Sequence, residues 1–442
     1  MAALARKPAT TIPFGYGAEA VARPNEPAWL TSKRAAARAV LAAGLPSPRV
    51  ESWKYTNLQA FATQAFAMLS DGPADAPLAL LKQTTIDRPS HRVVFVDGRF
   101  APALSNVGAV PSGVTIRSLD DAISSDEFVV ARRFGALADA SSNAIAALNA
   151  AHGSGGVVIA LARGASLTEP VHLVFIATAS DRAMAFHPRV LIEAGEGSAL
   201  TLIESHVSEA GAYWSNPVAE IAVARDATVR HWTLQDQARD ATHLALNAVS
   251  LAQGARYESV LLAIGAGLAR HEFDVAIEGE HAEVSLDGGY LIGGTQHSDH
   301  TTRIVHKVGH ASTREVYKGV LDGRARGVFQ GTIVVEPGAD KTDAHQLSRT
   351  LMLSVGAEAD AKPELMIYAD DVKCSHGASS GALDPAQLFY LRSRGIGEAA
   401  ARALLVEGFI AETIERIADE KVRAYFTRAA GDGLRAHGGA LS

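Results

Sequence analysis

The sequence predicts a mainly β protein in which a parallel β-helix lies between helical N- and C-terminal regions. From Gly156 onward, short runs of Val, Ile, Leu and Thr recur between Gly, Asp, Glu or Ala turns, and almost no helix-length periodicity remains. Turns that place an alanine before a new strand recur at spacings of 28, 28, 27, 29 and 28 residues. A recurring unit of this length without a helix buries its apolar face only by stacking on its neighbours, which indicates a β-solenoid.

Each repeat unit fits two strands joined by two turns. Residues 199–204 and 218–223 form one such pair of strands. The leucine-rich-repeat pattern is absent, and a propeller blade needs a longer period. We therefore expect stacked rungs from about residue 156 to 380, in a β-helix core of residues 156–382. The alanines that define the repeat are Ala199, Ala227, Ala255, Ala282, Ala311 and Ala339.

Residues 1–155 are predicted to form a mostly helical N-terminal region. Residues 30–43 are rich in the helix formers Ala, Arg and Lys, and a Gly followed by a Pro ends this helix. Further helices are expected near residues 118–123 and 126–151. A strand over residues 91–99, ending in an Asp-Gly turn, is expected between them.

Two aromatic residues follow the first predicted helix. Trp53 and Tyr55 lie among polar residues. Large rings with a polar tip often bury their apolar body against a neighbouring element, so both are predicted to anchor the N-terminal region to the next domain.

Residues 383–442 return to helical periodicity and are predicted to form a C-terminal helical region. Asp384 suits an N-cap, and Pro385 suits the first helical position. Further helices are expected over residues 398–407 and 411–428.

Composition excludes several function classes. The net charge of −7 is spread along the chain without a basic patch, which argues against a nucleic-acid partner. A single cysteine builds no disulfide framework, and no apolar run long enough to span a membrane occurs, so we expect a cytoplasmic protein without membrane contact. Nothing matches the P-loop pattern, so no ATP site is expected in this chain.

The only cysteine lies near the end of the repeat region, in the run Asp-Asp-Val-Lys-Cys-Ser-His-Gly. Side chains of an extended segment alternate, so Cys374 and His376 share one face and Lys373 and Ser375 the other. A thiolate and an imidazole are suitable ligands for iron, zinc or copper. Two ligands do not complete a site, so the remaining ligands have to come from a partner chain, sulfide or water. The alternative is that Cys374 is a small buried hydrophobe and His376 a turn residue.

Other candidate sites have less support. Asp343 and His345 share a face of an extended segment but lack a nucleophile. The pattern Gly-x-Ser-x-Gly at residues 377–381 lacks the helix that follows a nucleophile elbow, so we expect a small-residue turn there. The remaining histidines recur at apparent turns or strand edges and are expected to be solvated or hydrogen-bonded; they are His271, His281, His297, His300, His306, His310 and His345.

Several runs together resemble the SufD family, a subunit of the SUF iron-sulfur cluster assembly machinery. The densest similarity covers about 70 residues from Gly327 to Ile396, and its most specific part surrounds Cys374 and His376. Trp53-Lys-Tyr-Thr resembles an N-terminal signature of the family. The single cysteine favours SufD over the related SufB subunit, which typically carries more.

The resemblance implies a right-handed parallel β-helix and a non-catalytic scaffold role. It implies pairing with a SufB-like subunit through the β-helix, with Cys374 and His376 at the interface where a transient iron-sulfur cluster forms, shared between the subunits. It also implies docking of a SufC-like ABC ATPase on the C-terminal helices, and a possible homodimer when the chain is isolated. The apolar anchors of that docking region are Leu388, Phe389, Leu391 and Ile396.

Two other functions remain open from the residues alone. One is a β-helix carbohydrate-active enzyme, which needs paired carboxylates and exposed aromatics in a groove. The other is acyl or sulfur transfer by Cys374 and His376 as nucleophile and base, which needs a thiol with a lowered pKa. The aromatic residues available in the repeat region are Tyr213, Trp214, Trp232, Tyr257, Tyr290 and Tyr317.

Overall fold

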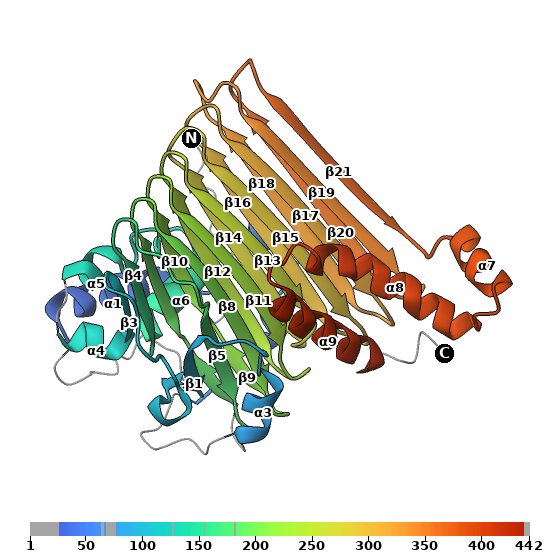
Figure 1. The fold of residues 1–442 in the computed structure, drawn as a ribbon, viewed down its shortest axis with the longest axis horizontal. Helices are drawn as coiled ribbons and strands as arrows, with labels where there is room; N and C mark the ends of the chain where they lie inside the picture. The colour runs from blue at the N-terminus through green and yellow to red at the C-terminus, as the bar shows by residue number, and fades with distance from the viewer. Residues whose placement is uncertain are drawn as a thin grey trace.

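The computed structural model describes residues 26–436 except 63–65, 68–76, 126, 127, 154, 181 and 182. In this part of the chain, parallel strands stack into two long sheets that wind around a common apolar core, with helices at both ends of the sequence (Figure 1). The predicted fold class, a mainly β chain with a parallel β-helix between helical regions, is confirmed. None of the helices described is both long and apolar enough to cross a membrane.

One wall of the solenoid is a sheet of ten strands. From β5 onward, successive members lie one rung apart in the sequence, and all members pair in parallel except β2, which is antiparallel to β1. In spatial order they are β2 (Arg99–Phe100), β1 (His91–Val96), β5 (Val171–Ala177), β8 (Ala199–Ser208), β11 (Thr228–Asp236), β13 (Arg256–Ala263), β15 (Glu283–Ile292), β17 (Ser312–Leu321), β19 (Asp343–Met352) and β21 (Lys373–Gly381).

The opposite wall is a sheet of eleven strands. Its main path is parallel apart from β3, which is antiparallel to β4. That path is β20 (Glu358–Ile367), β18 (Arg326–Val335), β16 (His297–His306), β14 (Leu268–Ile277), β12 (Thr242–Leu251), β10 (Val218–Val223), β7 (Arg189–Ala194), β4 (Gly156–Leu161) and β3 (Val114–Ser118), with β6 (Met184–Phe186) and β9 (Tyr213–Ser215) at its side.

The repeating alanine marks one corner of the solenoid. In most rungs the residue before it has positive φ, as in Asp226 (57°), His281 (62°) and His310 (57°). Such a backbone turns sharply and favours Gly, Asn, Asp or His. The alanine that follows is buried, because only a small side chain fits inside the corner, as at Ala227 and Ala282. This recurring corner accounts for the spacing of the repeat.

Most of the N-terminal helices cover the outer face of the eleven-stranded sheet near β4, β7, β10 and β12, where their apolar side chains join those of the strands. The prediction of one helical segment over residues 126–151 is wrong, because the residues that the structure describes there form two separate helices. The segment is divided because the backbone N–H groups of Gly135, Leu137 and Ala138 donate to the buried Glu220 carboxylate, and Asn143 then caps a new helix. The elements are α1 (Ala28–Leu41), η1 (Glu51–Trp53), α2 (Gln59–Ala62), α3 (Leu78–Gln83), η2 (Pro102–Leu104), α4 (Leu119–Ser124), α5 (Phe128–Arg133) and α6 (Ala144–His152). Of these, α3 and η2 pack instead against β1 and β5 of the ten-stranded sheet.

The C-terminal helices are α7 (Pro385–Ser393), α8 (Glu398–Ile414) and α9 (Glu420–Ala436). Of these, α8 and α9 cover the outer face of the ten-stranded sheet, and α7 contacts α8. The predicted boundary between a helix over residues 398–407 and one over residues 411–428 is wrong. Helix α8 continues through Gly408 and buries Val406 and Ile410 against the sheet. The boundary lies at residues 415–419, where the Asp419 side chain accepts the first N–H groups of α9.

The two ends of the solenoid differ. At the N-terminal end, the antiparallel strands β2 and β3 close the edges of the two sheets. At the other end, β21 and β20 are the edge strands, and neither contains a fully buried residue. Edge strands leave a row of N–H and C=O groups without a strand partner, so this end is open to another strand.

Candidate functional site

Cys374 and His376 lie on β21, the edge strand of the ten-stranded sheet. Cys374 is in register with Ala344, and His376 with Gln346. Ala344 belongs to the core of the solenoid, and Cys374 packs against that core, so this face of β21 is the inner one. Cys374 is half-buried and His376 is exposed. Both residues thus face the interior at the end where the interior meets solvent.

The environment of Cys374 does not activate its thiol. Burial raises the pKa of Cys374, and the Asp343 carboxylate acts in the same direction. A nucleophilic cysteine needs a lowered pKa, so this environment disfavours the transfer chemistry considered above. Among the residues that the structure describes, no three His, Cys, Asp or Glu side chains stand together as a metal site. For Cys374 and His376 to hold a metal, further ligands would therefore have to come from a partner chain, sulfide or water.

Two residues behind His376 escaped sequence analysis. The Gln346 side chain donates from Nε2 to Glu315 Oε2 at 2.7 Å, and both residues are buried. Burial raises the pKa of Glu315 to about 7, against the opposing effect of the Gln346 hydrogen bond. A carboxyl with such a shift near a candidate site is a functional candidate. The signal available was the repeat itself, because Glu315, Gln346 and His376 recur one rung apart.

On the outer face of the same strands, three side chains are linked in a row: Asp343, His345 and Ser375. His345 Nε2 lies 2.7 Å from Asp343 Oδ1, and His345 Nδ1 lies 2.6 Å from Ser375 Oγ. Asp343 and His345 share a face, as the alternation along the strand predicts, and the register of β19 and β21 places Ser375 beside His345. His345 and Ser375 are exposed on an open sheet face and Asp343 is only half-buried, whereas triads with a Ser nucleophile bury their carboxylate.

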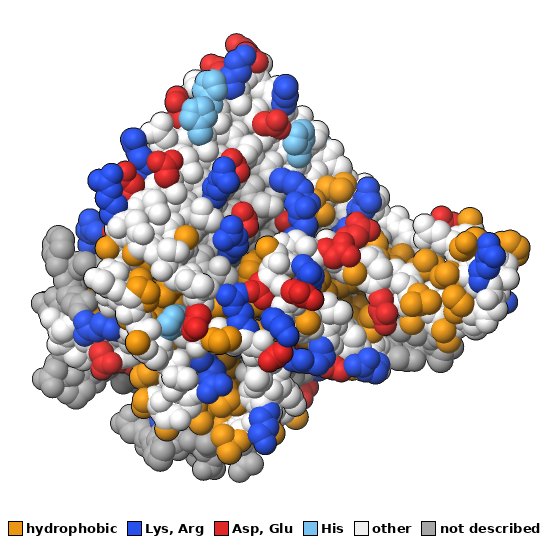
Figure 2. Space-filling model, in the orientation of Figure 1, with side chains coloured by type: hydrophobic (Ala, Val, Ile, Leu, Met, Phe, Trp, Pro, Cys, Tyr) orange, Lys and Arg blue, Asp and Glu red, His pale blue; other side chains and the backbone are white. Residues whose placement is uncertain are grey.

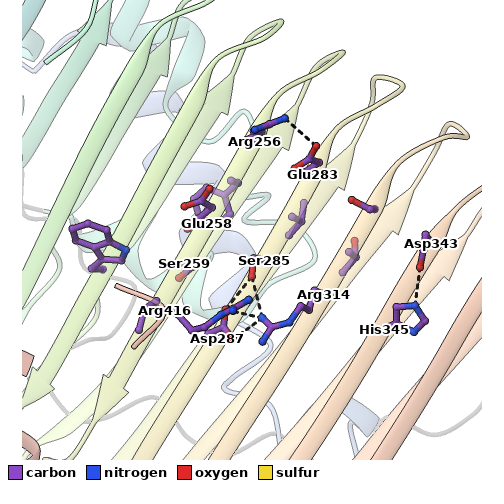
Figure 3. A pocket seen from close by; sticks show the side chains of 16 residues that line it. Arg256, Glu258, Ser259, Glu283, Ser285, Asp287, Arg314, Asp343, His345 and Arg416 are labelled. Carbon is purple, nitrogen blue, oxygen red and sulfur yellow. Dashed lines mark hydrogen bonds and ion pairs between the residues drawn. The ribbon is translucent and has the colours of Figure 1, made fainter. Parts of the chain in front are cut away.

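A groove of about 510 Å³ runs beside this row on the outer face of the ten-stranded sheet (Figure 3). Its acidic residues face basic partners: Arg314 lies 2.8 Å and Arg416 3.6 Å from the Asp287 carboxylate, which is nearly buried. Arg256 similarly pairs with Glu283. Carboxylates neutralised in this way are poorly suited to acid–base chemistry on a sugar. The aromatic residues that a sugar site would use are all buried: Tyr213, Trp214, Trp232, Tyr257, Tyr290 and Tyr317.

The pattern Gly-x-Ser-x-Gly was expected to form a turn, and this expectation is wrong. Gly377 and Gly381 lie within β21, paired with β19 as far as Leu351. The parallel neighbour holds this small-residue stretch extended, since its backbone completes the ladder.

The location expected for several histidines is also wrong. His271 lies in β14, and His300 and His306 lie in β16, all facing the interior with at most 3% exposed. The rings of His206, His243, His271 and His300 form a column, in which successive ring centroids lie 5.1, 4.9 and 5.5 Å apart. Burial lowers the pKa of His300 to about 3 and keeps it neutral. The strands carry polar residues on both faces, so polarity did not reveal which face is inside. As expected, His281, His310 and His345 are exposed and His297 is hydrogen-bonded to Thr56.

The predicted docking residues lie on and after α7. No residue of α7 is buried, and the helix projects from the body (Figure 1). Phe389 is 73% exposed, while Leu388, Leu391 and Ile396 are half-buried. Figure 2 shows hydrophobic side chains gathered over the lobe that α7 and the adjoining part of α8 form. Exposed apolar groups gathered in this way are typical of a protein-interaction surface.

Comparison with known proteins agrees with this architecture. The model of the SufBD core domain of SUF system FeS cluster assembly matches residues 175–409, and the model of the SufBD N-terminal region matches residues 17–173. An iron-sulfur cluster assembly SufBD family protein of Synechocystis sp. is 30% identical over 410 residues, covering 90% of each chain. The iron-sulfur cluster assembly protein SufD of Escherichia coli is 32% identical over 391 residues, covering 87% of this chain and 88% of that one. SufD of Bacillus subtilis is 31% identical over 283 residues, covering 63% and 64%.

Proposed function

The chain belongs to the SufBD family of iron-sulfur cluster assembly proteins, and we propose that within this family it is a scaffold subunit without a reaction of its own. Its open solenoid end pairs with a SufB-like subunit, and a nascent iron-sulfur cluster forms between the two chains. Cys374 and His376 contribute ligands from this side. The cluster is cargo that the complex passes on.

The observation that carries this proposal is the position of Cys374 and His376 on the inner face of the edge strand β21. A partner strand added to that edge brings its own side chains next to theirs. A cluster held by mixed Cys and His ligands from two chains is shielded from water yet easier to release than one held by four thiolates.

The ATPase partner has a separate surface in this proposal. A SufC-like ABC ATPase docks on α7 through Leu388, Phe389, Leu391 and Ile396, of which Phe389 is the most exposed. Docking is transmitted to the solenoid through α8, because Lys318 of β17 pairs with Glu412 and its ammonium lies 4.8 Å from the Phe409 ring centroid. Lys318 is buried, so a displacement of α8 would remove the carboxylate that compensates the burial of its ammonium group.

The test is anaerobic co-expression of this chain with SufB-like and SufC-like partners, followed by iron, sulfide and visible-absorbance measurements. We compare wild type with Cys374→Ala and His376→Ala, and use Ser380→Ala, an exposed position on the same strand, as control. Intact complexes with less cluster in the first two variants support a shared ligand set. Unchanged cluster content in both variants would refute the ligand assignment and leave only a role in holding the partners together.

A further inference from the structure

Three polar side chains follow one another across the inner face of the ten-stranded sheet toward its free edge. Glu315 of β17, Gln346 of β19 and His376 of β21 occupy equivalent positions on neighbouring strands. Neighbouring strands are about 4.8 Å apart, so each side chain is within reach of the next. All three line one hollow of about 430 Å³ at the open end.

The orientation of the Gln346 amide is fixed from one side. Its Nε2 donates to Glu315 Oε2 at 2.7 Å. The carbonyl oxygen and the amino group of a carboxamide point in different directions, so Oε1 is turned away from Glu315. Oε1 is buried and has no hydrogen-bond partner among the described residues. A buried acceptor in this position is unfavourable until a donor reaches it.

Gly331 on the facing strand β18 makes room for this amide. A Cβ at Gly331 would lie 2.2 Å from Gln346 Nε2 and 2.7 Å from the ring of Phe329. Any side chain at this position would displace Gln346. The glycine and Glu315 together hold the Gln346 amide in place from two directions.

We propose that Gln346 is the positioning residue for His376, and this inference rests on the proposed function. When a partner subunit covers β21, Gln346 Oε1 accepts the N–H of the His376 imidazole. The other ring nitrogen then offers its lone pair toward the iron. Glu315 acts one step further back by holding the amide in the orientation that presents the carbonyl.

In a neutral imidazole, the contact between Gln346 and His376 decides which ring nitrogen is available to bind iron. One ring nitrogen carries the proton and the other binds metal, and the hydrogen bond made by the first decides which is which. Either protonation state of Glu315 leaves an oxygen that accepts from Gln346, so the arrangement does not depend on titration of that carboxyl. Without Gln346 the His376 ring is free to rotate and to present either nitrogen.

The test uses the complex co-purified with SufB-like and SufC-like partners and measures two quantities for each variant. These are the rate at which an iron chelator removes iron anaerobically and the Tm of the complex. Gln346→Met removes the acceptor, and we expect iron loss roughly tenfold faster than in wild type. Gln346→Glu keeps an acceptor, and we expect it to stay within about threefold of wild type although a second buried carboxylate beside Glu315 lowers its Tm.

The comparison of these two variants distinguishes a positioning role of Gln346 from a packing role. If Gln346 only fills space, the variant with the higher Tm retains iron better, and that variant is Gln346→Met. Ser348→Ala is the matched control, because Ser348 lies on the same face of β19 but in register with Ala378. A rate of iron loss from Gln346→Met within about twofold of wild type, or equal rates from both Gln346 variants, overturns the inference.

The variant His376→Ala separates the two proposals. If it retains iron normally, the assignment of His376 as a ligand fails. If it loses iron while Gln346→Met does not, only the positioning role of Gln346 fails.

Discussion

The guanidinium carbon of Arg270 lies 4.0 Å from the ring centroid of Trp53. Arg270 is fully buried in the outer face of β14, donates to the Glu272 carboxylate at 2.7 Å and to the Ser52 carbonyl at 2.7 Å, and pairs with Asp299. The segment around Trp53 is thereby fastened to the middle of the solenoid, as predicted for Trp53. Tyr55 is only half-buried, so the anchor is mainly the tryptophan.

Trp53→Ala should destabilise the protein by about 3 kcal/mol, because it removes a large buried ring and leaves Arg270 without its stacking partner. Chemical denaturation at pH 7.5 measures this. Tyr55→Ala is the control and should cost less than half as much. Equal losses in the two variants would contradict the anchoring role of the indole.

Glu315→Gln should change how stability depends on pH. Because burial raises the pKa of Glu315 from 4.5 to about 7, the folded chain keeps a proton that the unfolded chain releases between these values. The wild-type free energy of unfolding therefore falls as pH rises from about 4.5 to about 7, by up to about 3 kcal/mol from this residue. Glu315→Gln should gain stability relative to wild type at pH 8 and little at pH 4.5. A constant difference across this range would argue against the shift; exposed Glu280→Gln serves as control.

The buried histidine column should make the fold sensitive to mild acid. Burial lowers the pKa of His300 from 6.5 to about 3, so below pH 6.5 the unfolded chain binds a proton at this residue and the folded chain does not. Stability is complete above pH 6.5 and is lost as pH falls, by about 2 kcal/mol between pH 7.5 and 5 from this residue. His300→Gln should show a shallower loss. The control is His310→Gln at an exposed corner; a response to pH identical in both variants speaks against the prediction.

Phe389→Asp should abolish co-purification of the SufC-like ATPase without changing the Tm of the isolated chain. The ring is 73% exposed, so its replacement removes no packing within the chain, while a carboxylate at the centre of an apolar contact is strongly unfavourable. Val355→Asp, at a fully exposed loop position, provides the matched control. Retention of the ATPase by Phe389→Asp would exclude α7 as its main contact.

Much of the solenoid could be predicted because its corner repeats. A residue with positive φ followed by a buried alanine recurs in most rungs, and this recurrence reveals the spacing of the rungs. The period of two along a strand also places Cys374 and His376 on one face. Sequence alone did not connect Glu315 with Gln346, because their contact depends on the register between rungs. The histidine column was missed for a related reason, since the inner wall of this solenoid is partly polar.

The alanine corner has a consequence for how this chain can change length. Losing a single residue within a strand turns every following side chain of that strand to the opposite face, which in β21 would bury Ser375 and expose His376. The corner spacings of 27 to 29 residues show that the turns absorb single-residue differences, so larger changes in length keep the alternation most simply by adding or removing a whole rung. Over evolutionary time the separation between the capped and open ends is thus expected to vary in steps of about 4.8 Å, one rung at a time, and never continuously.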